Sequence, residues 1–346
     1  MGSPTRHRRR KSREFRGPSV PTALAFVVLL YGIGALIART LPLTNLPAVI
    51  LAASSPYVPV AALGALVTTA LRRKKLLSAA AAVLLAASVA VQVPWLHFGR
   101  APDAGPHTTE VRVLSSNIRK GWADPTAFVA LADGRADVIT VSELTAEAVT
   151  RFGEAGIRKT FPYSILVPRP GAGGMGLWSR YPLTALPTSK YGSNFIAARV
   201  RIPGVTEAPL VASVHLMSPL AGGANTFAQW NHRITAARSE FADYAKTAGP
   251  AAVIIAGDFN ATPDMRQYRD LLGDGYRDAV NQTGAGFSPT YSPRPWIPPL
   301  ITIDHVLTRN SSAQSIRTVD IPGSDHRALL ATIAVPLDPT ASSAVT

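Results

Sequence analysis

The stretch VIIAGDFNATP, residues 253–263, decides the fold of this chain. It opens with four apolar residues, three of them β-branched, which is typical of a buried strand. Asp258 and Asn260 follow directly, in a Gly-Asp-Phe-Asn turn. Thr262-Pro263 then matches the start of a helix, which we expect to run to about Leu272. The informative pattern is therefore a buried strand that ends in carboxylate and amide side chains.

The same pattern recurs on both sides of this stretch. Polar residues end or interrupt five further apolar segments: Asn117 after 111–115, Glu143 after 138–141, His215 after 210–214, Asp304 and His305 within 301–307, and Asp325 and His326 before 329–335. A buried carboxylate is unfavourable unless it is paired or binds a metal. Several of them at the ends of apolar strands predict that these side chains converge on one site.

The elements between these segments indicate the fold class. Further strands are expected at 176–179 and 195–200, and helices are expected from Asp124-Pro125 onward and over 226–247. Apolar strands that alternate with helices need cover on both faces. We therefore predict an α/β fold, specifically a four-layer α/β sandwich of two packed sheets flanked by helices.

The residue types at the strand ends suit hydrolysis of a phosphate ester. The oxygen donors Asn117, Glu143, Asp258 and Asp325 are of the kind that Mg²⁺ or Mn²⁺ prefers. Histidines beside them supply acid and base chemistry near neutral pH. Such a set can neutralise phosphate charge, activate a water and protonate the leaving oxygen. The chain has no cysteine, which excludes disulfides, thiolate zinc sites and cysteine nucleophiles.

The first third of the chain has the composition of a membrane region. Only 16% of all residues are charged, against roughly 25% in a typical soluble protein. Three apolar stretches explain this dilution, at 18–38, 46–71 and 76–96, and each is close to or above the ~20 residues that cross a bilayer. We predict three transmembrane helices. A cleaved signal peptide is the alternative for the first stretch.

Positive charge predicts the orientation of these helices. The net charge is +14, but 12 of the 35 Lys and Arg and only one acid lie before Trp95, so most of the excess flanks apolar runs. The basic runs at 6–16 and 72–75 should both be cytoplasmic. Three spans then place the rest of the chain outside, as an extracytoplasmic domain of a multi-pass membrane protein. The expected divisions are 1–17 basic N-terminus, 18–96 membrane region, 97–110 linker, 111–336 catalytic domain and 337–346 flexible tail.

Seven segments of the C-terminal part resemble one known family, in its order and across residues 111 to 335. They are VRVLSSNIRKG (111–121), VITVSEL (138–144), GMGLWSRYPL (174–183), VASVHLMSP (211–219), VIIAGDFNATP (253–263), TIDHVLT (302–308) and GSDHRALLATI (323–333). The family is the endonuclease/exonuclease/phosphatase superfamily, which includes deoxyribonucleases and sphingomyelinases. A single motif of this kind is weak, but seven in order are specific.

The resemblance implies a role for each matching residue. Asn117, Glu143 and Asp325 are implied as the Mg²⁺ or Mn²⁺ site, and the catalytic set is implied to be His215, Asp258, Asn260, Asp304 and His326. His215 and Asn260 would contact the phosphate, and Asp304 would orient His326. Whether Asp258 or His326 is the general base stays open. Arg119 stands where some members carry an acid, so the number of metal ions also stays open. His305 is interpreted as structural.

The substrate class is less defined by the sequence. We first expect an enzyme that hydrolyses a phosphodiester in a nuclease-like reaction. The alternative is a phospholipid phosphodiesterase or phosphatase that acts at the membrane surface. A non-catalytic binding module is the third hypothesis. The C-terminal part has a net charge of only +3, which argues against strong nucleic-acid binding. The Pro- and aromatic-rich segment 287–300 suits either lipid or bases. The expected partners are the phosphate-ester substrate (a nucleic acid or a lipid headgroup) and the bilayer; nothing in the sequence requires a protein partner.

Overall fold

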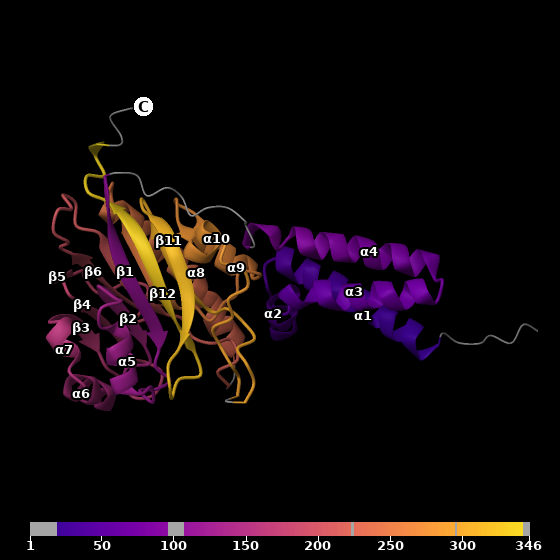
Figure 1. The fold of residues 1–346 in the computed structure, drawn as a ribbon, viewed down its shortest axis with the longest axis horizontal. Coiled ribbons are helices and arrows are strands. Elements are labelled where there is room, and N and C mark those ends of the chain that lie inside the picture. Colours follow the sequence, from indigo (N-terminus) through magenta and orange to yellow (C-terminus); the bar gives the residue numbers. More distant parts are fainter. Residues whose placement is uncertain (1–18, 96–106, 223–224, 295, 342–346) are drawn as a thin grey trace, which may run out of the picture.

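The structure is a computed structural model that describes residues 19–95, 107–222, 225–294 and 296–341. Three of the expected segments lie wholly or partly outside these ranges: the basic N-terminus 1–17, most of the linker 97–110 and the end of the tail 337–346. The described residues form a helical bundle that projects from a C-terminal domain, residues 107–341 (Figure 1).

The C-terminal domain consists of two six-stranded sheets with helices on their outer faces. The first sheet has the strand order β11-β12-β1-β2-β4-β3 and the second has the order β5-β6-β7-β8-β10-β9. The strands are β1 (Thr108–Asn117), β2 (Val138–Ser142), β3 (Tyr163–Val167), β4 (Met175–Ser179), β5 (Leu183–Ala185), β6 (Phe195–Val200), β7 (Leu210–His215), β8 (Val253–Asp258), β9 (Arg277–Asp278), β10 (Asp304–Arg309), β11 (Ser312–Asp320) and β12 (Arg327–Pro336). The predicted α/β sandwich is confirmed.

Each sheet contains one parallel pair of strands, β1 with β2 and β7 with β8, and all other pairs are antiparallel. The strands predicted from apolar runs are present, although β10 begins only at Asp304. The edge strands β3, β5, β9 and β11 were not predicted, because their side chains are largely exposed or alternate in burial and form no apolar run.

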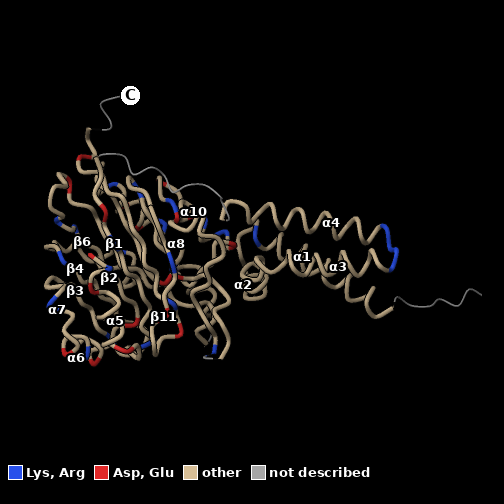
Figure 2. Tube along the Cα trace, viewed as in Figure 1, with Lys and Arg blue, Asp and Glu red and all other residues tan. Residues whose placement is uncertain are grey.

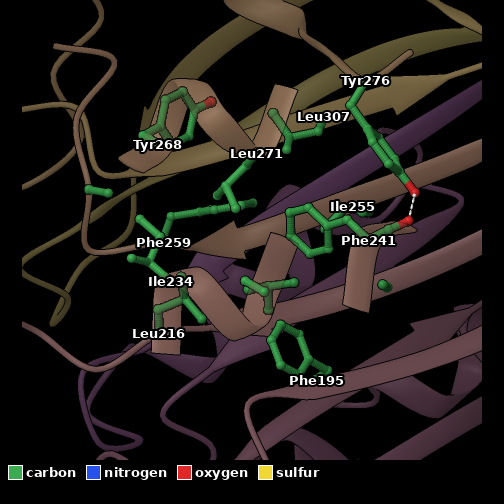
Figure 3. Close-up of a cluster of buried hydrophobic side chains, with 14 of the residues drawn as sticks. Phe195, Leu216, Ile234, Phe241, Ile255, Phe259, Tyr268, Leu271, Tyr276 and Leu307 are labelled. Carbon is green, nitrogen blue, oxygen red and sulfur yellow. Dashed lines mark hydrogen bonds between the residues drawn. The ribbon is translucent and has the colours of Figure 1, made fainter. Parts of the chain in front are cut away.

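Three apolar layers hold the domain together. The layer between the sheets contains residues such as Val113, Val211 and Ile254, which come from both sheets. Helices cover the outer face of the first sheet: α5 (Pro125–Ala132), α6 (Ala146–Glu154) and α7 (Ile157–Thr160). The outer face of the second sheet packs against α8 (Thr226–Ala248), α9 (Arg266–Arg269) and η3 (Asp270–Leu272), and α10 (Ala279–Thr283) lies beside it. Figure 3 shows this last layer, in which the Tyr276 hydroxyl donates to the Phe241 carbonyl over 2.8 Å.

The N-terminal bundle exposes apolar side chains on its outside and packs small residues in its interior. Its helices are α1 (Val20–Thr40), α2 (Leu46–Ala53), η1 (Ser55–Tyr57), α3 (Val58–Leu71), α4 (Lys75–Ala90) and η2 (Val93–Trp95). Large apolar side chains such as Leu24, Leu63 and Val83 are exposed, whereas alanines fill much of the interior. Small interior residues are typical of helices that pack within a bilayer.

The bundle contains two to three candidate membrane spans. Val20–Thr40 and Lys75–Trp95 are each long and apolar enough to cross a membrane, and Leu46–Ala53 with Ser55–Leu71 forms a third only if the pair, bent by 41°, counts as one span. The cluster Arg72–Lys75 lies at the end of the bundle remote from the C-terminal domain (Figure 2). Arg72 donates a hydrogen bond of 3.0 Å to Ser19, so the start of α1 lies at this same end.

Bundle and domain share one hydrophobic core. Leu43, Val49 and Trp95 of the bundle belong to the same buried cluster as the residues between β8 and α8. Buried polar contacts reinforce this junction, since Arg39 at the end of α1 forms an ion pair of 2.7 Å with Asp264. The helices are therefore packed onto the domain and do not hang from it on a tether.

Candidate active site

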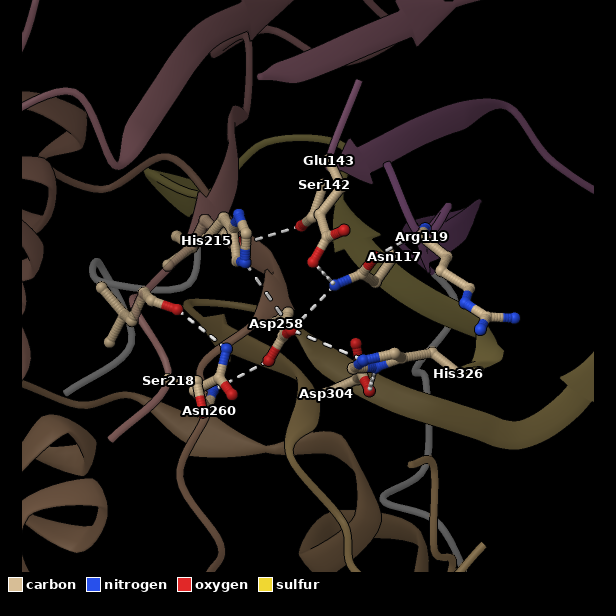
Figure 4. Close-up of polar contacts among 12 residues, drawn as sticks. Asn117, Arg119, Ser142, Glu143, His215, Ser218, Asp258, Asn260, Asp304 and His326 are labelled. Carbon is tan, nitrogen blue, oxygen red and sulfur yellow. Dashed lines mark hydrogen bonds and ion pairs between the residues drawn. The ribbon is translucent and has the colours of Figure 1, made fainter. Parts of the chain in front are cut away.

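The ends of the central strands bring the predicted polar residues together. Asn117 ends β1 and Glu143 directly follows β2, while His215 and Asp258 are paired residues at the ends of β7 and β8. Parallel strands end at the same edge of a sheet, and the two sheets are packed face to face. The edges of both sheets therefore meet at one place, which Figure 4 shows.

Asp258 is the centre of this arrangement. One of its carboxylate oxygens, Oδ2, accepts a hydrogen bond of 3.0 Å from Asn117 Nδ2, and Nε2 of His215 and of His326 each lie 3.8 Å from the same oxygen. The other oxygen, Oδ1, accepts from the backbone N–H of Asn260 at 2.8 Å. Asp258 is 1% exposed, so this carboxylate is held by the polar groups around it and not by bulk water.

Asp304 and His326 form a buried pair. Nδ1 of His326 and Oδ2 of Asp304 are 2.8 Å apart, a contact that fixes the orientation of the imidazole. Asp304 is itself held by the hydroxyl of Thr290, which accepts from the backbone N–H groups of Ile303 and Asp304. The second oxygen of Asp304 is buried and has no hydrogen-bond partner among the described residues.

These contacts perturb the protonation of the two central groups. Burial, followed by repulsion from the Asp304 carboxylate, raises the pKa of Asp258 to about 6. Burial opposes the charged form of His326, but the charge of Asp304 and its hydrogen bond outweigh burial and raise the pKa of His326 to about 10. Without other ligands, the neighbouring carboxyl groups therefore favour the protonated form of the His326 ring. Shifts of this size in a cleft are typical of functional groups.

Asn117 and Glu143 lie side by side on the opposite side of Asp258. Asn117 Nδ2 donates to Glu143 at 3.1 Å, and the backbone N–H of Lys120 donates to the other oxygen of Glu143 at 2.7 Å. Arg119, Lys120 and Glu143 all have positive φ angles, between 47° and 63°. Non-glycine residues with this backbone conformation are uncommon and cluster at functional sites.

Two of the histidine and acid candidates lie apart from this centre. Asp325 is at the rim, where its partly exposed carboxylate is 3.7 Å from the Arg119 guanidinium. His305 is fully buried behind the site, and its nitrogens contact Asp278 at 2.9 Å and the Ala261 carbonyl at 2.9 Å. These contacts use both ring nitrogens and agree with the structural interpretation of His305.

A cleft of about 870 Å³, which we call the catalytic cleft, is lined by six of the predicted residues: Glu143, His215, Asp258, Asn260, Asp325 and His326. Three further polar or aromatic residues line this cleft, and sequence reasoning singled out only Tyr291, in the aromatic-rich segment 287–300, and missed Asn194 and Arg233. The Tyr291 ring packs against the His326 imidazole with centroids 4.9 Å apart. Asn194 donates to the His215 carbonyl at 2.6 Å and accepts from Arg233, also at 2.6 Å. None of the three follows a central apolar strand, so the strand-end pattern could not find them.

Comparison with known proteins agrees with this geometry. The model of the "Endonuclease/Exonuclease/phosphatase family" matches residues 114–326, more than half of the chain and nearly all of the C-terminal domain. The chain belongs to this family. As a family member it is a hydrolase that acts on phosphate esters, as the sequence predicted. No curated protein matches the chain.

Solved structures share the fold of the family domain at low sequence identity. An endonuclease/exonuclease/phosphatase protein from Bacteroides vulgatus is 16% identical, with a TM-score of 0.53 over 66% of this chain and 99% of that one. A functionally unknown conserved protein from Enterococcus faecalis V583 is 16% identical, with a TM-score of 0.51 over 65% and 100%. Truncated Caenorhabditis elegans TDP2 is 14% identical, with a TM-score of 0.50 over 65% and 97%. In each case about a third of this chain lies outside the shared region.

Proposed function

We propose that this protein is a membrane-anchored phosphodiesterase that needs a divalent metal ion and whose catalytic domain lies outside the cytoplasm. The observation that carries this proposal is the line Asp304–His326–Asp258 beside the Asn117–Glu143 pair, at a cleft that Glu143, Asp258 and His326 line. Proton-handling groups and oxygen donors are thus placed on two sides of one space, where a phosphate group can contact both.

The residues present fit a hard divalent cation. Carboxylates of Glu143, Asp258 and Asp325 line the cleft. Among the described residues, Arg119 at the rim pairs with Asp325, and the rings of His215 and His326 lie near Asp258, so these cations offset only part of the negative charge. A Mg²⁺ or Mn²⁺ ion would offset this charge, and Asn117 and Glu143, with Asp325 at the rim, would supply its oxygen ligands. Such an ion polarises the phosphoryl oxygen of the substrate. Asp258, Asp304 and His326 also have donor atoms within 4.8 Å of one another. We assign those three to proton handling, because His326 lies between the Asp304 and Asp258 carboxyl groups, which favour its protonated form, and a protonated ring does not ligate a metal.

Each protein residue of the site then has its own role in the reaction. The Asp258 carboxylate orients a water and accepts its proton while the water oxygen bonds to phosphorus. One P–O ester bond breaks, and its oxygen takes a proton from the His326 imidazolium, which regains one from Asp258. The imidazolium of His326, held by Asp304, and the imidazole of His215 face the phosphate and offset its growing negative charge. Asn260 is held by a hydrogen bond of 2.9 Å from its amide to the Leu216 carbonyl, so its side chain is preorganised at the same edge.

The proposed sidedness follows from the two ends of the bundle. The basic turn Arg72–Lys75 and the start of α1 share the end remote from the catalytic domain. Since positive loops stay in the cytoplasm, the domain would lie on the other side. The absence of cysteine allows a clean test: in intact cells, a membrane-impermeant maleimide should label Glu207→Cys in the domain but not Lys74→Cys. Labelling of Lys74→Cys alone would reverse the assignment.

The proposed reaction is tested with the full-length protein in detergent. The substrate is bis(p-nitrophenyl) phosphate, a small phosphodiester that has no acyl chain and is called the chain-free substrate below. Turnover should require Mg²⁺ or Mn²⁺, stop in EDTA and fall by a factor of about 10² or more in His326→Ala. His232→Ala is the matched control, because His232 is an exposed histidine on α8 and should leave turnover unchanged. Equal turnover in the His326 variant and the wild type would refute the assignment of the site.

A further inference from the structure

One wall of the catalytic cleft belongs to the membrane bundle. Val49, Ile50, Ala53 and Tyr57 line the cleft from α2 and η1, and residues such as Asp258 and His326 line it from the C-terminal domain. In Figure 1, α2 lies at the end of the bundle that meets the C-terminal domain. The cleft therefore has a polar side that suits a phosphate and an apolar side that comes from the bundle.

A second, mostly apolar cavity adjoins this wall. It has a volume of about 230 Å³ and lies between the bundle and the C-terminal domain. Its apolar lining comes from η1, α3, α4, η2 and the 287–301 segment, and includes Pro56, Pro59, Val89, Trp95, Phe287 and Ile301. Ala53 and Ile301 line both this cavity and the catalytic cleft, so the two spaces adjoin. A sealed apolar cavity of on the order of 150 Å³ already stays dry and takes up hydrocarbon.

The junction that forms these spaces is fixed by specific contacts. The Tyr57 hydroxyl donates to the Leu300 carbonyl at 2.6 Å, and its ring meets the Phe287 ring edge-on at 5.7 Å. On the other side, Arg39 pairs with Asp264 at 2.7 Å in a buried contact. The apolar wall is thus a built part of the cleft and is held in place on both sides.

The wall distinguishes between substrate classes. In a polynucleotide, both substituents of the scissile phosphate carry further charged phosphates, and placing one of them against α2 would desolvate charge without a partner. A phospholipid has one polar and one hydrocarbon substituent, which matches the two sides of the cleft. In addition, Ile50 lines the cleft and is 56% exposed, on a bundle whose outer surface is apolar. The cleft therefore borders the surface that a bilayer would cover.

We propose that the substrate is a phospholipid of the surrounding bilayer, whose phosphodiester occupies the catalytic cleft and whose acyl chain lies along α2 and enters the adjoining cavity. This inference rests on the proposed phosphodiesterase function and deepens it. It assigns to α2 and η1 the role of a chain-binding wall, which explains why the anchor is a bundle packed onto the domain.

The test compares a substrate that has an acyl chain with one that has none. Ala53→Phe puts a large side chain where cleft and cavity meet, and Ala82→Phe, at an exposed position of α4, is the matched control. Full-length protein is assayed with Mg²⁺ on phosphatidylcholine and phosphatidylglycerol vesicles, on bis(p-nitrophenyl) phosphate and on single-stranded DNA. We expect Ala53→Phe to lower vesicle-lipid turnover at least ten times more than it lowers turnover of bis(p-nitrophenyl) phosphate, and we expect Ala82→Phe to match the wild type on both substrates.

A second variant guards against misfolding of the first. Val89→Trp narrows the same cavity from α4, and soluble phosphatidylcholines of increasing chain length give KM for each protein. In the wild type KM should fall as the acyl chain lengthens, and in both variants KM should depend less on chain length. Cleavage of DNA but not of lipid, or a KM independent of chain length, would overturn the lipid inference alone. Wild-type protein without activity on the chain-free substrate would instead overturn the phosphodiesterase proposal, and this inference with it.

Discussion

Asp304→Asn separates the chemical role of the buried pair from its structural role. Asp304 contacts the His326 ring over 2.8 Å, and its other oxygen is buried without a partner. At an effective dielectric constant of about 20, opposite charges about 4 Å apart attract by roughly 4 kcal/mol. A rise of about 1.4 kcal/mol in the activation free energy slows a reaction about tenfold. If the substitution removes the attraction of roughly 4 kcal/mol from the transition state, turnover should therefore fall by a factor of about 10³.

The same substitution should change stability through two opposing effects. The buried His326 ring loses the charge that raises its pKa, which destabilises the folded state. Neutralising a buried carboxylate removes a desolvation cost that the unpartnered oxygen of Asp304 does not offset with a hydrogen bond. The assay is kcat on bis(p-nitrophenyl) phosphate with Mg²⁺, alongside the thermal unfolding midpoint of the same sample in detergent. A loss of kcat below tenfold would refute the role given to the pair, and a large fall in the midpoint would show that Asp304 acts mainly in folding.

Three further predictions address other parts of the structure. Gly257→Ala would place a Cβ 1.9 Å from a backbone oxygen of β7, so we expect a lower unfolding midpoint and reduced activity, measured together. Arg39→Ala leaves Asp264 buried without its partner and should cost about 3–5 kcal/mol, seen as a lower denaturation midpoint in detergent; an unchanged midpoint would contradict a rigid junction. When EDTA keeps the site free of metal, folding raises the pKa of His326 from 6.5 to about 10. The protonated His326 ring therefore contributes its full stabilisation below about pH 6.5, and this contribution is lost as pH rises toward 10. The difference in unfolding midpoint between wild type and His326→Gln should therefore shrink from pH 7 to pH 10, and a difference that grows would refute this linkage.

Much of the fold and of the polar centre could be predicted from local sequence patterns. A buried strand is an apolar run, and a polar residue at its end stands out against that run, as Asp258 does after Val253–Ala256. The bundle was predictable for a similar reason, because a membrane span is a long apolar segment with basic flanks. These signals depend only on residues close together in the chain.

The tertiary structure alone decided which of these groups meet and what surrounds them. Asn194 and Arg233 enter the site from positions that no strand-end pattern marks, and their places follow from packing. Arg39 and Asp264 are 225 residues apart, and no local pattern pairs them. The apolar wall that α2 adds to the catalytic cleft also depends on contact between segments that are far apart in the sequence. A sequence shows that a segment is apolar, but whether it faces lipid, core or substrate depends on which distant surface it packs against.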